Sequence, residues 1–185
     1  IAFDIYTENN LYNKYIDIKF VKLIKTRQKK MRLSIDLKDY NSDYIIVGNK
    51  TSNNVMEGYF HRILYSSQYF TLNSVYCLFT LSNMKMEKYF QKMKCCFDYD
   101  KNLKVINKIK MIENTILDKI HFDTKKNKIL RIAEQLKQGF IKIINERNYE
   151  NYGKTTNNKK RILLKISGIW ESSDSYGVTF KFSLN

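Results

Sequence analysis

This chain has few side chains suited to catalysis, and those it has do not form a recognisable motif in the sequence. The two histidines, His61 and His121, are far apart in the sequence. The cysteines Cys77, Cys95 and Cys96 contain no C-x-x-C pair, so the ligand spacing typical of a zinc site is absent. The sequence also lacks a phosphate-binding glycine loop, a nucleophile elbow and a dinucleotide fingerprint. We therefore expect a protein that is not an enzyme and that needs no metal or cofactor.

One pair of carboxylates leaves an alternative open. Asp98 and Asp100 flank Tyr99 at an expected turn, where two carboxylates could hold a divalent metal and make the chain a nuclease. Acidic residues are also typical of the first turn of a helix, because they interact favourably with its N-terminal dipole, and we prefer that interpretation. His61 lies in an aromatic stretch, and we expect it to be a packed or surface residue.

Side chains suited to binding a polyanion are far more abundant. The chain has 33 Lys and Arg against 18 Asp and Glu, a formal net charge of +15, together with 14 Tyr. Cationic groups neutralise phosphates, and exposed rings stack on unpaired bases without needing a particular sequence. This composition predicts single-stranded nucleic acid as a partner. A merely solvated basic surface is the alternative, since abundant Lys and Asn without any Pro also fit an AT-rich coding bias.

The candidate nucleic-acid-binding residues form three groups: a basic segment, an aromatic stretch and the end of the chain. They are Lys19, Lys22, Lys25, Arg27, Lys29, Lys30 and Arg32 in the first group, Tyr59, Arg62, Tyr65 and Tyr69 in the second, and Lys160, Arg161, Lys165 and Trp170 in the third. Tyr59 and Tyr65 are the preferred stacking residues, and Trp170 either stacks on a base or packs. The phenylalanines expected in the core are Phe60, Phe70, Phe79, Phe140, Phe180 and Phe182.

Periodicity predicts strands first and helices later in the chain. Apolar residues alternate with polar ones over 15–24 and 31–37, a third strand is expected at 44–47, and two or three more lie within 58–81. Residues 84–97 have helical spacing after Asn83, with a strand over 89–97 as the alternative. Amphipathic helices are expected over 103–121 and 126–146. We expect a single domain over 1–185 with a loose arm at 1–14 and a helical insertion at 100–147.

The final 25 residues predict a β-hairpin. Ile162, Leu164 and Ile166 alternate with polar or outward residues in the first arm, as do Val178 and Phe180 in the second. The intervening segment ESSDSYG is rich in turn formers, and Gly177 could supply a positive φ there. Gly168 lies inside the first arm, which predicts a bulge or a close backbone approach.

Within this hairpin, KISGIWE and YGVTFKF over 165–182 resemble the closing hairpin of the single-stranded-DNA-binding proteins of large eukaryotic DNA viruses. That family is related to the phage T7-type OB-fold binders. The resemblance implies an α+β fold, mainly antiparallel β, with an OB-fold-like barrel that carries two or three helices and is closed by this hairpin. It also implies a non-catalytic protein of viral DNA replication and recombination. The chain ends in FKFSLN, so partner recruitment by the acidic tail of the phage relatives is not carried over.

Other expectations concern location and partners. The longest apolar run is far shorter than a membrane span, so no membrane partner is expected, and unpatterned cysteines favour a reducing intracellular compartment. For a viral protein this compartment is the cytoplasm or nucleus of the infected cell. Replication proteins or a second copy are further partners. The alternative function is a structural role in a virion or a large ribonucleoprotein.

Overall fold

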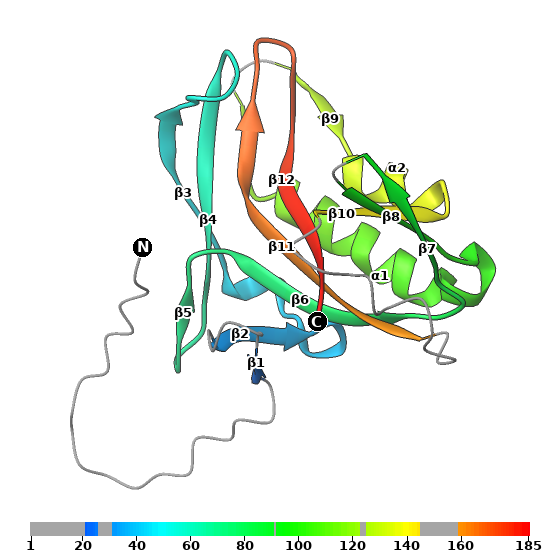
Figure 1. Ribbon diagram of the computed structural model, residues 1–185. Coiled ribbons are helices and arrows are strands. Elements are labelled where there is room, and N and C mark those ends of the chain that lie inside the picture. Colours follow the sequence, from blue (N-terminus) through cyan, green and yellow to red (C-terminus); the bar gives the residue numbers. More distant parts are fainter. Residues whose placement is uncertain (1–20, 26–30, 91, 123–124, 145–158) are drawn as a thin grey trace, which may run out of the picture.

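A computed structural model of the chain describes residues 21–25, 31–90, 92–122, 125–144 and 159–185. The C-terminal hairpin lies at its centre (Figure 1), formed by β11 (Lys160–Glu171) and β12 (Ser175–Leu184). The ladder runs from Ile162 opposite Leu184 to Glu171 opposite Tyr176. The predicted hairpin is therefore confirmed, but its turn is shorter than the expected 171–177, since β11 ends at Glu171 and β12 begins at Ser175.

The strands form one mixed, open sheet. Its main path is β1-β2-β6-β11-β12-β10-β8-β7, while β4 pairs with β11, β3 and β5, and β9 pairs with β12. The remaining strands are β1 (Val21–Lys25), β2 (Met31–Asp36), β3 (Ile45–Ser52), β4 (Tyr59–Ser66), β5 (Thr71–Leu72), β6 (Val75–Leu81), β7 (Lys85–Tyr89), β8 (Lys92–Cys96), β9 (Asn127–Ile129) and β10 (Phe140–Ile144). Within the described residues, β1 and β7 are the two ends of this path and do not pair with each other. A mainly β fold with two helices is confirmed, whereas the OB-fold-like barrel is not, because the sheet does not close.

Two helices cover the core side of the sheet. They are α1 (Tyr99–Leu117) and α2 (Arg131–Lys137), and short 3-10 turns occupy Leu37–Asp39 and Ser42–Tyr44. The Asp98 carboxylate accepts a hydrogen bond from the Lys101 backbone N–H at 3.2 Å, and that bond lowers its pKa. Asp98 is thus the N-cap of α1, as the preferred interpretation predicted.

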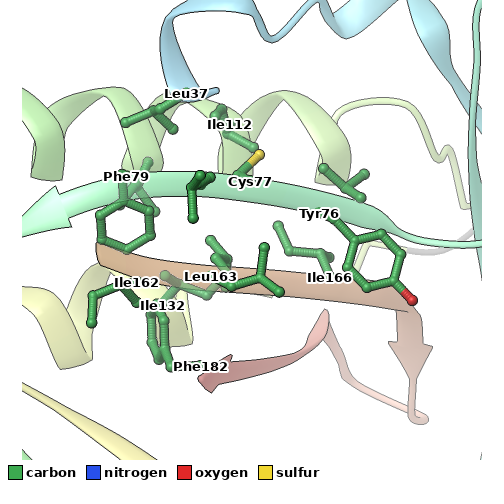
Figure 2. Close-up of a cluster of buried hydrophobic side chains, with 14 of the residues drawn as sticks. Leu37, Tyr76, Cys77, Phe79, Ile112, Ile132, Ile162, Leu163, Ile166 and Phe182 are labelled. Carbon is green, nitrogen blue, oxygen red and sulfur yellow. The ribbon is translucent and has the colours of Figure 1, made fainter. Parts of the chain in front are cut away.

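The core lies between this sheet and the helices. Figure 2 shows Cys77 and Phe79 of β6, Ile162 of β11 and Phe182 of β12 gathered with Ile112 of α1. All five side chains are at most 6% exposed. Burying each such side chain contributes about 1.5–3 kcal/mol. The core prediction is confirmed for Phe79 and Phe182, while Phe60, Phe70, Phe140 and Phe180 are only half-buried.

Two predicted helices are wrong over most of their length. Residues 84–97 form the β7–β8 hairpin, and the alternative, a strand over 89–97, is confirmed in part by β8. Asn83 is a turn residue with φ of 54° rather than a helix cap. The helix expected over 126–146 is divided into β9, α2 and β10. Gly139 explains why α2 ends before β10, since its φ of 73° is the left-handed conformation that ends a helix.

The two glycines of the hairpin act differently from each other. The ladder shifts between Ile166 and Gly168, which confirms the predicted bulge, and a Cβ on Gly168 would lie 2.2 Å from the Phe60 ring. Gly177 is a strand residue opposite Trp170, so the expectation of a turn with positive φ is wrong. Its lack of a side chain makes room for the Trp170 ring, which a Cβ would approach to 2.8 Å.

Candidate nucleic-acid interface

A cluster of cations and rings covers the outward side of β7, β8 and β10. Lys94 of β8 is paired with Glu87 of β7 and with Lys142 of β10, and Lys92 of β8 is paired with Tyr89 of β7. Residues paired directly across a sheet point to the same side. Of the alternate residues, Cys95, Ile141 and Ile143 are buried in the core, and Met86 and Met93 are half-buried. We call the outward set the three-strand face; its members are Lys85, Glu87, Tyr89, Lys92, Lys94, Phe140 and Lys142.

Ammonium groups and rings alternate on the three-strand face. The Lys94 Nζ lies 4.8 Å from the Phe140 ring centroid, and the Lys142 Nζ lies 5.2 Å from the centroid of Tyr89. Tyr89 is 43% exposed, and at the hairpin tip Phe90 is 85% exposed. Four lysines against one glutamate give the face a formal charge of +3. The arrangement therefore offers both of the groups that bind unpaired nucleotides.

The same side of the sheet carries further cations. Ile143 and Phe182, the paired residues that join β10 to β12, are both buried, so Lys142 and Lys181 share the opposite side. Lys165 is paired directly with Lys181, and its Nζ lies 5.6 Å from the Tyr76 ring centroid. The prediction that Lys165 points away from the apolar side of its strand is confirmed.

Among the other predicted binding residues, several are exposed but dispersed. Arg62 on β4 and Arg161 on β11 are exposed, and Lys160 is half-buried. Tyr59 and Tyr69 are 45% and 66% exposed, yet Tyr69 lies in the turn between β4 and β5, far from β7 in Figure 1.

Tyr65 and Trp170 are both buried, so the predicted stacking role of Tyr65 is wrong, and of the two expectations for Trp170 the packed ring is confirmed. Tyr65 is 1% exposed because its ring packs edge-on against Tyr44, and its hydroxyl accepts the Asn41 N–H at 3.1 Å. Trp170 is 6% exposed and has the Arg131 guanidinium 5.0 Å from its ring centroid.

The basic segment that sequence analysis placed first is described only in part. Lys19, Arg27, Lys29 and Lys30 lie outside the described residues. Lys22, Lys25 and Arg32 belong to β1 and β2, at the opposite end of the sheet path from β7, and only their backbone is described. The described part of this segment, β1 and β2, is therefore separated from the three-strand face by the other strands of the path.

A second polar site surrounds Glu171 at the end of β11. Its Oε1 accepts hydrogen bonds from Lys126 Nζ at 2.8 Å and Lys50 Nζ at 3.3 Å, and its Oε2 is 3.1 Å from His61 Nε2. Burial raises the pKa of Glu171, but the bonds from Lys126, His61 and Lys50 outweigh burial and lower it to about 2. His61 is thus a packed histidine, as predicted, and Glu171 was not singled out by the sequence.

Groups able to do catalysis remain scattered. Cys77 and Cys95 are fully buried, and burial raises the pKa of both thiols to about 12, so neither is a nucleophile at neutral pH. Among the residues that the structure describes, no three His, Cys, Asp or Glu side chains gather in a way that could hold a metal ion. Neither described helix combines the length and the hydropathy required to span a membrane.

Comparisons with known proteins add no family to this picture. No protein-family model, no curated protein and no solved structure significantly matches the chain.

Proposed function

We propose that this chain binds single-stranded nucleic acid, single-stranded DNA first of all, on the three-strand face. The observation that carries the proposal is the ladder register, which gathers four lysines with Tyr89 and Phe140 on one side of β7, β8 and β10. The resemblance of the final hairpin supports a role in coating exposed strands during viral DNA replication and recombination. In this proposal the chain is not an enzyme.

The mechanism needs no chemistry beyond charge and stacking. Ammonium groups of the three-strand face neutralise phosphates and release their counterions, so affinity falls as salt rises. Tyr89 and Phe140 provide flat faces for unpaired bases, each stacked base contributing about 1–3 kcal/mol. Neither interaction depends on base identity, so binding is tolerant of sequence.

Fluorescence anisotropy with labelled oligo-dT at several salt concentrations tests this function. The wild type should bind with a steep negative dependence of log affinity on log salt. The double variant Lys94→Ala with Lys142→Ala should bind less tightly, with a slope shallower by about 1.4, because each lost phosphate contact removes about 0.7 on a single strand.

A matched control removes the same charge from the other side of the molecule. Lys104 and Lys110 are exposed on α1, which covers the core side of the sheet, so their double alanine variant should bind nearly as the wild type does. Equal losses in the two double variants would show that only net charge matters, and no binding at low salt would exclude the function.

Exposed apolar side chains favour a second candidate, a structural subunit of a virion or a ribonucleoprotein. Val55 is 94% exposed and Phe90 is 85% exposed, and assembly would cover such groups. Co-sedimentation with assembled particles, without affinity for free oligonucleotides, would support this candidate over the first.

A further inference from the structure

A cavity that the proposed function does not use surrounds the Glu171 cluster. It lies between the β3–β4 hairpin, the chain that follows α1 and the turn joining β11 to β12, at the upper end of the sheet in Figure 1. Its volume is about 740 Å³. Pockets for small molecules typically measure about 300–1,000 Å³, so the space suits a ligand of that size.

Aromatic rings line this cavity from two elements. Tyr59 comes from β4 and is 45% exposed. Phe122 comes from the segment after α1, and the Tyr176 ring fixes its position, with the two ring centroids 4.8 Å apart. Exposed and positioned rings of this kind favour a flat, unsaturated ligand.

The buried carboxylate fixes two ammonium groups beside these rings, and only one of them is open to a ligand. Lys126 is held by Glu171 and the Ser172 carbonyl, and its side chain is 9% exposed. The Lys50 Nζ lies 3.7 Å from the Tyr59 ring centroid and also binds Glu171, but its side chain is 48% exposed. A ligand therefore meets the Lys50 ammonium, held in place in advance over one face of the Tyr59 ring.

The charges around the cavity favour an anionic group near Lys50. Glu171 lies beneath the ammonium groups with a side chain only 5% exposed, so a ligand meets its partners and not the carboxylate itself. His61 and His121 are the other basic side chains that line the cavity. Glu57, exposed in the loop before β4, is the remaining carboxylate that lines the cavity, and it opposes an anion.

We propose that this cavity binds a nucleoside monophosphate, a flat base carrying one phosphate, with the base against Tyr59 and the phosphate at Lys50. Binding at this site does not depend on the three-strand face, and it holds equally for a free nucleotide and for the terminal nucleotide of a strand. The free nucleotide and the terminal nucleotide share the same chemistry, a flat base and a phosphate in one ligand.

Titration calorimetry of the full chain with AMP, adenosine and inorganic phosphate tests the site. AMP should bind saturably and more tightly than either fragment. Tyr59→Leu and Lys50→Met should each weaken AMP binding about tenfold, as expected for the loss of one stacking or phosphate contact. Glu57→Gln should tighten it, because this exposed carboxylate repels the phosphate. Tyr69→Leu, which changes an exposed ring outside the cavity, should leave it unchanged.

The outcomes separate this site from the sheet face. The Lys94→Ala, Lys142→Ala variant should bind AMP as the wild type does, even where it has lost oligo-dT. An AMP titration without saturation overturns the proposal, as does AMP binding that Tyr59→Leu and Lys50→Met both leave intact. Urea unfolding of each variant checks that weakened binding does not reflect loss of the fold. A short 5′-phosphorylated oligonucleotide that competes with AMP would identify the strand end as the source; its failure to compete would identify the free nucleotide.

Discussion

At the scale of single residues, Glu171 links the stability of the fold to pH. Its pKa is about 2 in the folded chain against an ordinary value of 4.5, because Lys126, His61 and Lys50 bind the ionised form. The ionised carboxylate therefore stabilises the fold above about pH 4.5, and this stabilisation is lost as the pH falls toward 2. The linked free energy is about 3 kcal/mol.

Replacing Glu171 with Gln tests this linkage. The variant should be less stable than the wild type at pH 7 by about 3 kcal/mol, and the difference should shrink as the pH falls below 4.5. Urea unfolding at a series of pH values measures it. Glu57→Gln, in an exposed loop that lines the same cavity, is the control and should change stability little at pH 7. A constant difference for Glu171→Gln would contradict the linkage.

At the scale of elements, α2 depends on a side chain of α1. The carboxylate of Glu113 is fully buried and accepts the backbone N–H groups of Ile132 and Ala133 at 2.9 and 2.8 Å. The N-cap residue Leu130 makes no side-chain hydrogen bond of its own. A seven-residue helix is too short to be stable alone, so this remote cap is expected to hold it in place.

Glu113→Ala should therefore destabilise the protein by about 2–4 kcal/mol, because two buried N–H groups lose their acceptor. Hydrogen exchange should show the loss of protection concentrated in α2 and its neighbour β10. Glu134→Ala, an exposed carboxylate on α2, is the control and should change stability little. Uniform loss of protection across the sheet would instead assign Glu113 a general role in the core.

The elements also show which parts of the fold a sequence can predict. The hairpin β11–β12, the bulge at Gly168 and helix α1 follow from local alternation, glycine placement and amphipathic spacing, and each is present. The segments β7 and β8 fitted a helical period through Met86, Tyr89 and Met93, with a strand over 89–97 as the alternative, and β10 lies at the end of the helix predicted over 126–146. Their place in the sheet depends on partners distant in the sequence, which single-segment periodicity does not encode.

The candidate site was less predictable than the fold for the same reason. The sequence indicated that lysines and rings do the binding. The residues that converge on the three-strand face, however, come from segments whose periodicity favoured helices. Tyr65 was predicted to stack because it lies in the same aromatic stretch as Tyr59, but long-range packing against Tyr44 buries it. Exposure depends on which elements cover a strand, so only the assembled sheet separates the rings of the core from those of the face.

At the scale of the whole molecule, an excess of charge and a set of exposed rings make separable contributions to binding. A formal charge of +15 attracts any polyanion, duplex or single-stranded, and this attraction varies with salt. Stacking on Tyr89 requires an unpaired base and involves no counterions. The two contributions can therefore be distinguished by their salt dependence and by competition with duplex DNA.

Tyr89→Leu should weaken oligo-dT binding about 5-fold or more, as expected for the loss of one stacked base worth about 1–3 kcal/mol, while the salt slope stays unchanged. The preference for single strand over duplex should fall by a similar factor, because the lysines that both forms contact remain. Anisotropy titrations with unlabelled duplex competitor measure both quantities, and Tyr69→Leu, an equally conservative change at an exposed ring away from the face, should alter neither. If Tyr89→Leu changed the slope but not the preference, Tyr89 would act by positioning Lys142, whose Nζ lies 5.2 Å from its ring centroid, and the stacking role would have to be abandoned.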